Sequence, residues 1–408
     1  MLKRIVDVAD DEVAALVTSF LYFFALLAGY FILRPLRDAM GVAIGTPNLP
    51  WLFTATLIAM LVLVPIYSAL VAKLSRPRLI PLIYRFFLLN LLCFFAAWRF
   101  GVAPDWTYRV FYVWLSVYNL FVVSVFWSFM ADIWTPAQGR RLFGFIAAGG
   151  SLGSIVGSSV VLSLIRPLGP TVLLLISACL LEATARMAKR LARSARAGSP
   201  QPVGGGLLDG FWHAVRSPYL FGIVAQTFLF TTTSTFLYAL QNSALKGWGD
   251  DAARAKFFST EDLIVNGAAA LFQSSMTGRL VRRVGVGGAL ALTPAITALG
   301  FAAVWFFPSL WIVAGFYVVR RILHFAVDRP AKEMLFTAVE RDDRYKTKSL
   351  IDTAIYRLGD QVGIWSYPSL GALAVPVAVP LALVWLGVNA ALARGYNARI
   401  HAHQGAPS

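Results

Sequence analysis

The stretch Val13-Ala-Ala-Leu-Val-Thr-Ser-Phe-Leu-Tyr-Phe-Phe-Ala-Leu-Leu-Ala-Gly-Tyr-Phe-Ile-Leu33 decides the fold of this chain. It contains no charged side chain. A helix rises about 1.5 Å per residue, so a run of this length crosses a hydrocarbon core of about 30 Å. The preceding segment, Met1 to Glu12, is short and polar, and the run is too long for a signal sequence. We therefore interpret it as a retained membrane helix.

Similar apolar runs recur along the whole chain. Apolar residues make up 58% of the sequence and charged residues 14%, whereas soluble proteins are about a quarter charged. We predict an all-α integral membrane protein with 12 transmembrane helices, the last two separated near Pro376 and Pro380. The predicted spans are residues 12–38, 51–72, 79–99, 108–131, 142–165, 168–187, 215–240, 257–281, 286–307, 309–327, 348–372 and 375–394.

The net charge of +16 comes from basic residues in the connections between apolar runs. It therefore indicates orientation in a bilayer rather than a nucleic-acid partner. The richer set of connections belongs in the cytoplasm, which places both termini there. This set comprises Lys3/Arg4, Lys73/Arg76/Arg78, Arg140/Arg141, Arg186 to Arg196, Arg279/Arg282/Arg283, Arg320 to Lys348 and Arg394/Arg399.

A basic and then glycine-rich connection divides the predicted helices into six and six. We expect an N-terminal bundle at 1–187, a cytoplasmic linker at 188–213, a C-terminal bundle at 214–396 and a cytoplasmic tail at 397–408. Two six-helix bundles are the plan of major facilitator transporters. The two cysteines and four histidines show no metal-ligand spacing, so no metal and no cofactor are expected.

The first predicted helix ends with Arg34, Arg37 and Asp38. Charges at bilayer depth need a partner or water. Arg34 and Asp38 are four residues apart and can form a pair, which leaves Arg37 for an anion. Pro35 opens backbone groups in the same turn. The alternative is that these residues only end the helix at the outer interface.

The predicted helix 348–372 carries Asp352, Arg357 and Asp360. Arg357 and Asp360 are three residues apart and can neutralise each other, while Asp352, Tyr356 and Asp360 form a stripe at four-residue steps. A carboxylate there suits a coupling proton or cation, and an arginine suits an anion. A structural ion pair between helices is an equal alternative.

Two asparagines are further candidates for substrate contact. Asn119 lies in the middle of span 108–131, and Asn266 lies inside span 257–281. A hydrogen bond between helices is the alternative for Asn119. For Glu261 and Asp262 we favour a capping role in the first turn of their helix, which Ser259 begins.

Glycines at four-residue spacing mark one helix as a packing helix. Gly149, Gly153 and Gly157 form a small-xxx-small face for close contact with another helix. The segment does not match a phosphate-binding loop of the P-loop type, because no Lys-Ser or Lys-Thr follows the glycines and no strand precedes them.

Three stretches resemble the ATP/ADP exchange translocases of plastids and obligate intracellular bacteria. They are Tyr30-Phe-Ile-Leu-Arg-Pro-Leu-Arg-Asp38, Phe126 to Gly150, and Lys346-Thr-Lys-Ser-Leu-Ile-Asp352. The resemblance implies the major facilitator fold and a nucleotide or another phosphate-bearing anion as substrate. Arg37 stands where that family has a functional lysine, and Asp360 stands where it has another lysine. The glutamate that the family has in helix 4 has no counterpart here.

The leading hypothesis is a secondary transporter that moves a small anionic or phosphate-bearing solute by alternating access across a bacterial inner membrane. Arg34, Arg37, Asn119, Asn266 and Arg357 would contact the solute. Asp38, Asp352 and Asp360 would carry coupling protons or balance charge. The alternatives are a proton-coupled exporter of a hydrophobic or cationic compound, and a non-transporting subunit of an envelope complex. We expect no enzymatic activity and a monomer whose partners are the bilayer and the solute.

Overall fold

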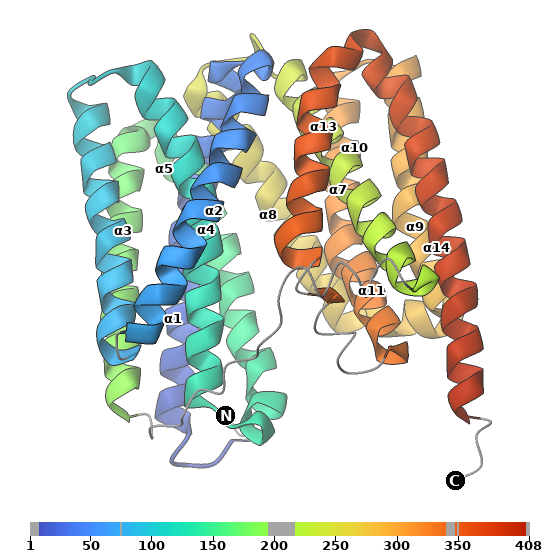
Figure 1. Cartoon of the computed structure of the whole chain (residues 1–408). Helices are drawn as coiled ribbons and strands as arrows, with labels where there is room; N and C mark the ends of the chain where they lie inside the picture. Colours follow the sequence, from blue (N-terminus) through green and yellow to red (C-terminus); the bar gives the residue numbers. More distant parts are fainter. Residues whose placement is uncertain (1–7, 74–75, 195–216, 340–346, 349–350, 405–408) are drawn as a thin grey trace. The chain divides into compact units, whose positions relative to one another are not determined.

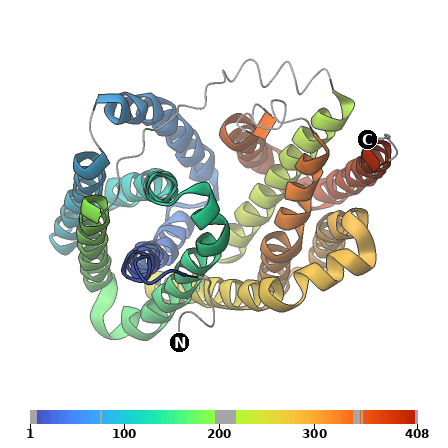
Figure 2. The same ribbon diagram turned by 90° about the horizontal axis from the view of Figure 1, so that it is seen from below.

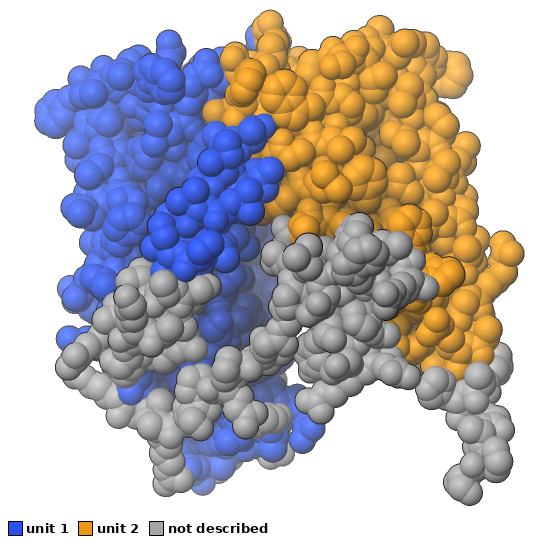
Figure 3. All heavy atoms as spheres, viewed as in Figure 1, with its two compact units in different colours: residues 1–44, 54–201, 247–266 blue, residues 45–53, 202–246, 267–408 orange. Residues whose placement is uncertain are grey.

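The computed structural model describes residues 8–73, 76–194, 217–339, 347–348 and 351–404. Every element in these ranges is helical. The chain forms two compact units, coloured separately in Figure 3. Unit 1 holds residues 1–44, 54–201 and 247–266, and unit 2 holds residues 45–53, 202–246 and 267–408. The predicted linker at 188–213 lies largely outside the described residues, so the predicted bundle limits remain a prediction.

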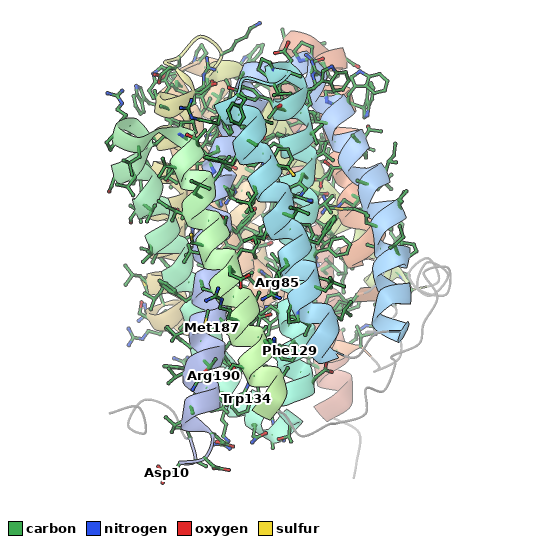
Figure 4. The ribbon with its side chains drawn as sticks, turned by 90° about the vertical axis from the view of Figure 1, so that its left-hand side faces the viewer. Asp10, Arg85, Phe129, Trp134, Met187 and Arg190 are labelled. Carbon is green, nitrogen blue, oxygen red and sulfur yellow. The ribbon has the colours of Figure 1, made fainter. Side chains whose placement is uncertain are left out.

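Unit 1 consists of helices (Figure 1). They are α1 (Val13–Ile44), most of α2 (Leu49–Lys73), α3 (Arg76–Arg99), α4 (Pro104–Ile133), α5 (Pro136–Ser194) and the first part of α8 (Asp251–Ser275). All of them except α8 contain a segment long and apolar enough to cross a bilayer. Figure 4 looks onto α3 and the last part of α5, with Arg85 and Arg190 labelled.

One element, α5, is two helices in sequence. Its 59 residues would reach almost 90 Å at 1.5 Å per residue, about three times the hydrocarbon thickness. The break falls at Gly169, which has φ 76° and lies between Pro167 and Pro170. Only glycine adopts this backbone conformation without strain, and the prolines interrupt the hydrogen-bond ladder. The break separates the predicted spans 142–165 and 168–187.

The glycine stripe of α5 lies against α1. A Cβ atom added at Gly149 would lie 2.5 Å from the carbonyl oxygen of Phe20. At Gly153 and Gly157 it would overlap the carbonyl oxygens of Phe24 and Ala28. Figure 2, seen along the helices, shows α1 (dark blue) beside α5 (teal to green). The predicted packing role of the three glycines is confirmed.

The N-terminus of unit 1 is anchored just before α1. The Glu12 carboxylate accepts hydrogen bonds from the Ala9 backbone N–H at 3.0 Å and the Gln138 side-chain amide at 2.6 Å. It also pairs with Arg141 at 2.6 Å. The Ala9 N–H bond, then the Gln138 bond and the Arg141 charge, hold the pKa of Glu12 below its ordinary value of 4.5.

Unit 2 has the same kind of helical construction. Its elements are α7 (Pro218–Ala244), α9 (Thr277–Phe306), α10 (Leu310–Leu323), the π turn η3 (His324–Asp328), α11 (Arg329–Leu335), the π turn η5 (Ile351–Ile355), α13 (Tyr356–Leu370) and α14 (Ala374–Gln404). Glycines again provide close contact, because a Cβ at Gly363 of α13 would lie 2.9 Å from Thr235 of α7.

The membrane-crossing segments can be compared with the twelve predicted spans. Among the described residues, nine helical segments are long and apolar enough to cross a membrane. Three of them contain a break, at Gly169, Gly285 and Gly371. The charged helix α8 is a further helix of 25 residues. Each predicted span overlaps a helical element, but the number of apolar membrane-crossing segments among the described residues is nine rather than twelve. The last turn lies at Gly371 (φ 53°) rather than at the prolines, because α14 begins at Ala374 and contains Pro380.

Candidate functional site

Arg37 of α1 is engaged within its own unit. It donates to Asp38 Oδ1 from Nε (3.1 Å) and Nη2 (2.6 Å), and to Ser116 Oγ at 3.4 Å. Its guanidinium also lies 5.1 Å from the ring centroid of Tyr112. The prediction that Arg37 is left unpaired is therefore wrong. Neighbouring residues point to different faces of a helix, but the long arginine side chain turns back to the adjacent carboxylate.

Arg34 joins α1 to α8. The predicted pair with Asp38 is confirmed, with Nε 3.7 Å from Oδ2. A shorter contact, 2.8 Å, joins Arg34 Nη1 to Asp262 Oδ1. The capping role predicted for Asp262 is wrong, because α8 begins at Asp251, well before it. The carboxylate of Asp250 caps that helix instead, accepting from the Ala253 N–H at 2.8 Å.

These four residues, Arg34, Arg37, Asp38 and Asp262, form what we call the α1 charge cluster. Its formal charges balance. The two carboxylates are almost fully buried, whereas Arg34 and Arg37 keep 14% and 17% of their side-chain surface exposed. Asp38 contacts both guanidinium groups. The cluster therefore shows how an anionic oxygen is held between two arginines on one helix.

The charged residues of α13 form a second, smaller cluster in unit 2. Arg357 Nη1 lies 3.4 Å from Asp360 Oδ2, which confirms that the two can pair. Thr235 of α7 donates to Asp360 Oδ1 at 3.1 Å. Residues 351–355 form a π turn directly before α13, so the predicted stripe of Asp352, Tyr356 and Asp360 stays a prediction at its first member. The Asp352 side chain lies outside the described residues.

The two candidate asparagines lie in unit 1. Asn119 is half-buried on α4. Asn266 is half-buried on α8, and its Nδ2 atom is shielded from solvent without a hydrogen-bond partner. A buried amide donor without a partner costs free energy, so Asn266 is the better candidate for contact with a polar solute.

A charged residue of α10 has a different position from the predicted one. Arg320 was assigned to a cytoplasmic connection, but it is 4% exposed inside α10. The helical run continues through η3 and α11 to Leu335, so Arg320 lies in its interior. A sequence signal for this position exists, because Arg320, Arg321 and His324 interrupt an apolar run from Leu310 to Val327, and ionisable residues inside such runs are expected to be functional.

Comparison with solved structures identifies the architecture. A nucleoside transporter, NupG, aligns over 96% of this chain and 99% of its own, with a TM-score of 0.62 and 14% identity. A transporter of the POT family in complex with 5-aminolevulinic acid aligns over 94% and 96%, with a TM-score of 0.64 and 11% identity. The chain has the major facilitator fold.

A third solved structure, of another transporter, has the same major facilitator fold. A bacterial homologue of the human lysosomal transporter Spinster, solved in an inward-facing and unoccupied conformation, aligns over 93% of this chain and 98% of its own. Its TM-score is 0.60 and its identity 12%. No protein-family model and no curated protein sequence matches the chain. At these identities the likeness establishes the fold and the multi-pass membrane architecture.

Proposed function

We propose that this chain is a secondary transporter that moves a small anionic solute by alternating access. The α1 charge cluster carries the proposal. Four ionised side chains in membrane helices cost several kcal/mol unless they serve a polar pathway or each other. Their partial exposure, confined to the two arginines, favours a role beyond mutual neutralisation.

The cluster also favours an anion over a cation. Asp38 is a carboxylate of the chain itself that lies between two guanidinium groups. A carboxylate or phosphate group of a solute has the same geometry and charge, and arginine binds both through paired N–H donors. In this proposal the solute competes with Asp38 for Arg37, and the released Asp38 keeps Arg34.

Several finer assignments belong to the same proposal. A phosphate-bearing or nucleotide-like solute is the first class to test, and nucleosides are the second because one structural neighbour is described as a nucleoside transporter. Residues Asn119, Asn266, Arg357 and Asp360 are the further contacts and coupling groups in the proposed pathway. We place the protein in a bacterial inner membrane, as a monomer with both termini in the cytoplasm.

The test begins with thermal-shift screening of the purified protein against phosphorylated metabolites, nucleosides and organic cations. A ligand that binds only the native state adds about 2.7 kcal/mol at 100 times its Kd, which raises the melting temperature measurably. Each hit is then measured by uptake into proteoliposomes. Pumping of cationic or hydrophobic compounds along a pH gradient, with no response to anions, would support the exporter alternative instead.

Variants of Arg37 test whether uptake of the solute depends on the α1 charge cluster. Arg37→Ala should abolish uptake of the anionic solute, and Arg37→Lys should retain part of it because the charge remains. The matched control is Arg85→Ala. Arg85 (Figure 4) is also a helix arginine paired with a carboxylate, Glu182 at 3.3 Å, but its side chain is 52% exposed. Uptake that survives Arg37→Ala as well as Arg85→Ala would remove Arg37 from the pathway.

A further inference from the structure

A buried arginine in unit 2 is surrounded by neutral oxygen atoms. Arg320 donates from Nε to Thr297 Oγ1 at 3.0 Å and from Nη1 to Ser234 Oγ at 2.7 Å. Its Nη2 donates to the Phe230 carbonyl oxygen and to Thr233 Oγ1, at 3.1 and 2.9 Å. None of these acceptors carries a charge, so they orient the guanidinium without cancelling its positive charge inside the bundle.

Two ionisable residues follow Arg320 at four-residue steps. His324 and Asp328 begin and end the π turn η3, and His324 Nδ1 lies 3.2 Å from Asp328 Oδ2. The imidazole is stacked on Phe230 with ring centroids 4.2 Å apart. The Asp328 side chain is 3% exposed, and its Oδ1 atom has no hydrogen-bond partner. Asp328 thus contacts the imidazole through one oxygen and leaves the other for a ligand.

Further unpartnered polar atoms belong to the same layer of the bundle. They are both amide atoms of Gln226, the Thr293 hydroxyl and Asn389 Oδ1, and these three residues are 0–1% exposed. Each lies one helical turn from a residue around Arg320: Gln226 from Phe230 on α7, Thr293 from Thr297 on α9, and Asn389 from Trp385 on α14.

Chain direction places these three residues on the same side of Arg320. The helices α7 and α9 run opposite to α10 and α14. An earlier residue on α7 or α9 therefore lies at the same height in the bundle as a later residue on α10 or α14. Gln226, Thr293 and Asn389 therefore lie at about the same height in the bundle as His324 and Asp328. Unpartnered buried groups of this kind are satisfied by internal water in membrane bundles as in soluble proteins.

The π turn separates this polar layer from a surface pocket. The pocket has a volume of about 450 Å³ and is lined by Gln273, Thr277, Phe325, Arg329, Pro330 and Glu333. Gln273 donates to the Phe325 carbonyl at 2.9 Å, and Thr277 donates to the Ala326 carbonyl at 2.7 Å. Phe325 of η3 thus lines the pocket, and two further lining residues are hydrogen-bonded to the η3 backbone; π turns occur frequently at functional positions.

We propose that His324 and Asp328 form a proton-binding site inside the C-terminal bundle, hydrated by the polar layer and reached from the pocket. A proton from water binds to the imidazole, and the imidazolium then remains hydrogen-bonded to the Asp328 carboxylate. The summed charge of Arg320, His324 and Asp328 changes from zero to +1. The role of this proton in coupling rests on the proposed transport function, whereas its binding does not.

The surroundings of the pair make this charge change consequential. The charged and titratable groups that act on it are Arg320 on α10, Arg329 on α11 and, through Arg320, Tyr317 and Tyr356. The side chains of the polar layer at the height of the His324–Asp328 pair, Gln226, Thr293 and Asn389 on α7, α9 and α14, are uncharged.

The added positive charge is therefore offset mainly by the Asp328 carboxylate, which lies 3.2 Å from the imidazole. Protonation at this site alters the electrostatic balance of four helices at once, which is the property that a coupling group requires.

The test uses the small number of imidazoles in the chain. Replacing His213, His401 and His403 with glutamine leaves His324 as the single histidine. Infrared difference spectra of this variant in detergent, recorded between pH about 5 and about 8, report protonation of His324 alone. Adding His324→Gln supplies the background.

We expect an imidazole difference band that titrates with one proton and is lost in His324→Gln. Asp328→Asn should lower the titration midpoint by about one pH unit or more, because the imidazolium loses its carboxylate partner. The matched control is Asp105→Asn, in the first turn of α4, which should leave the midpoint unchanged.

A His324 band that does not change across this pH range overturns the proposal. So does a spectrum that responds to Na⁺ instead of pH and loses that response in Asp328→Asn, which would indicate a metal-cation site. Because no solute is involved, a titrating His324 in a protein without uptake would refute only the transport function.

Discussion

The link between Arg34 and Asp262 can be measured by a double-mutant cycle. The perturbations are Arg34→Gln, Asp262→Asn and the two together, each close in shape to the original side chain. At 2.8 Å and an effective dielectric constant of about 20, the attraction is about 6 kcal/mol before desolvation is subtracted. Removing one partner of a buried pair costs about 3–5 kcal/mol.

The structure makes the two single changes unequal. Asp262 is almost fully buried, so Arg34→Gln removes the guanidinium 2.8 Å from a desolvated carboxylate and should destabilise the protein by about 3–4 kcal/mol. Asp262→Asn leaves an arginine that is 14% exposed and still lies 3.7 Å from Asp38, so about 2 kcal/mol is expected. The double variant should lose less than the sum, which corresponds to a coupling energy of about 2 kcal/mol.

The assay is reversible unfolding in detergent, followed by circular dichroism during titration with denaturant. The matched control cycle uses Arg85 and Glu182, with side chains 52% and 24% exposed, for which a coupling energy below about 1 kcal/mol is expected. Coupling between Arg34 and Asp262 of less than about 0.5 kcal/mol would refute the reasoning. So would an Asp262→Asn variant that is less stable than Arg34→Gln.

Three further predictions concern other parts of the chain. Gly153→Ala should destabilise the protein by about 1–3 kcal/mol in the same assay, because its Cβ overlaps a carbonyl oxygen of α1; Gly144→Ala, with open space around its Cβ, should not. Glu12→Gln should lower the melting temperature at pH 7, and the difference should shrink below pH about 4.5, since a lowered folded-state pKa stabilises above the unfolded pKa and is lost as pH falls; a constant difference would contradict this. Arg320→Lys should cost about 1–3 kcal/mol, because one ammonium group cannot reproduce the planar fork that donates to four acceptors; a variant with unchanged stability would show that charge alone is needed.

Much of the fold could be predicted from sequence because the bilayer leaves few choices. Backbone groups in hydrocarbon must be satisfied within a helix, so each apolar run specifies a spanning helix and its approximate length. The glycine stripe at Gly149, Gly153 and Gly157 was also readable, since close helix contact needs small residues at a fixed spacing. The last turn was misplaced because proline is tolerated within α14, whereas the positive φ of Gly371 marks the actual turn.

The candidate site was readable only in part. Pairs within one helix, Arg34 with Asp38 and Arg357 with Asp360, follow from spacing alone. The contact of Arg34 with Asp262 does not, because 228 residues separate the two and only packing brings α8 to α1.

By itself the sequence determined that the chain crosses a membrane many times and leaves charges inside apolar helices, because hydropathy and charge are local properties of each segment. The tertiary structure alone decided the distant partners of those charges: Asp262 for Arg34, and a set of neutral oxygens for Arg320. The reason is physical. The free energy of a buried charge depends on groups that lie within a few ångströms in space, and helices distant in sequence supply most of those groups.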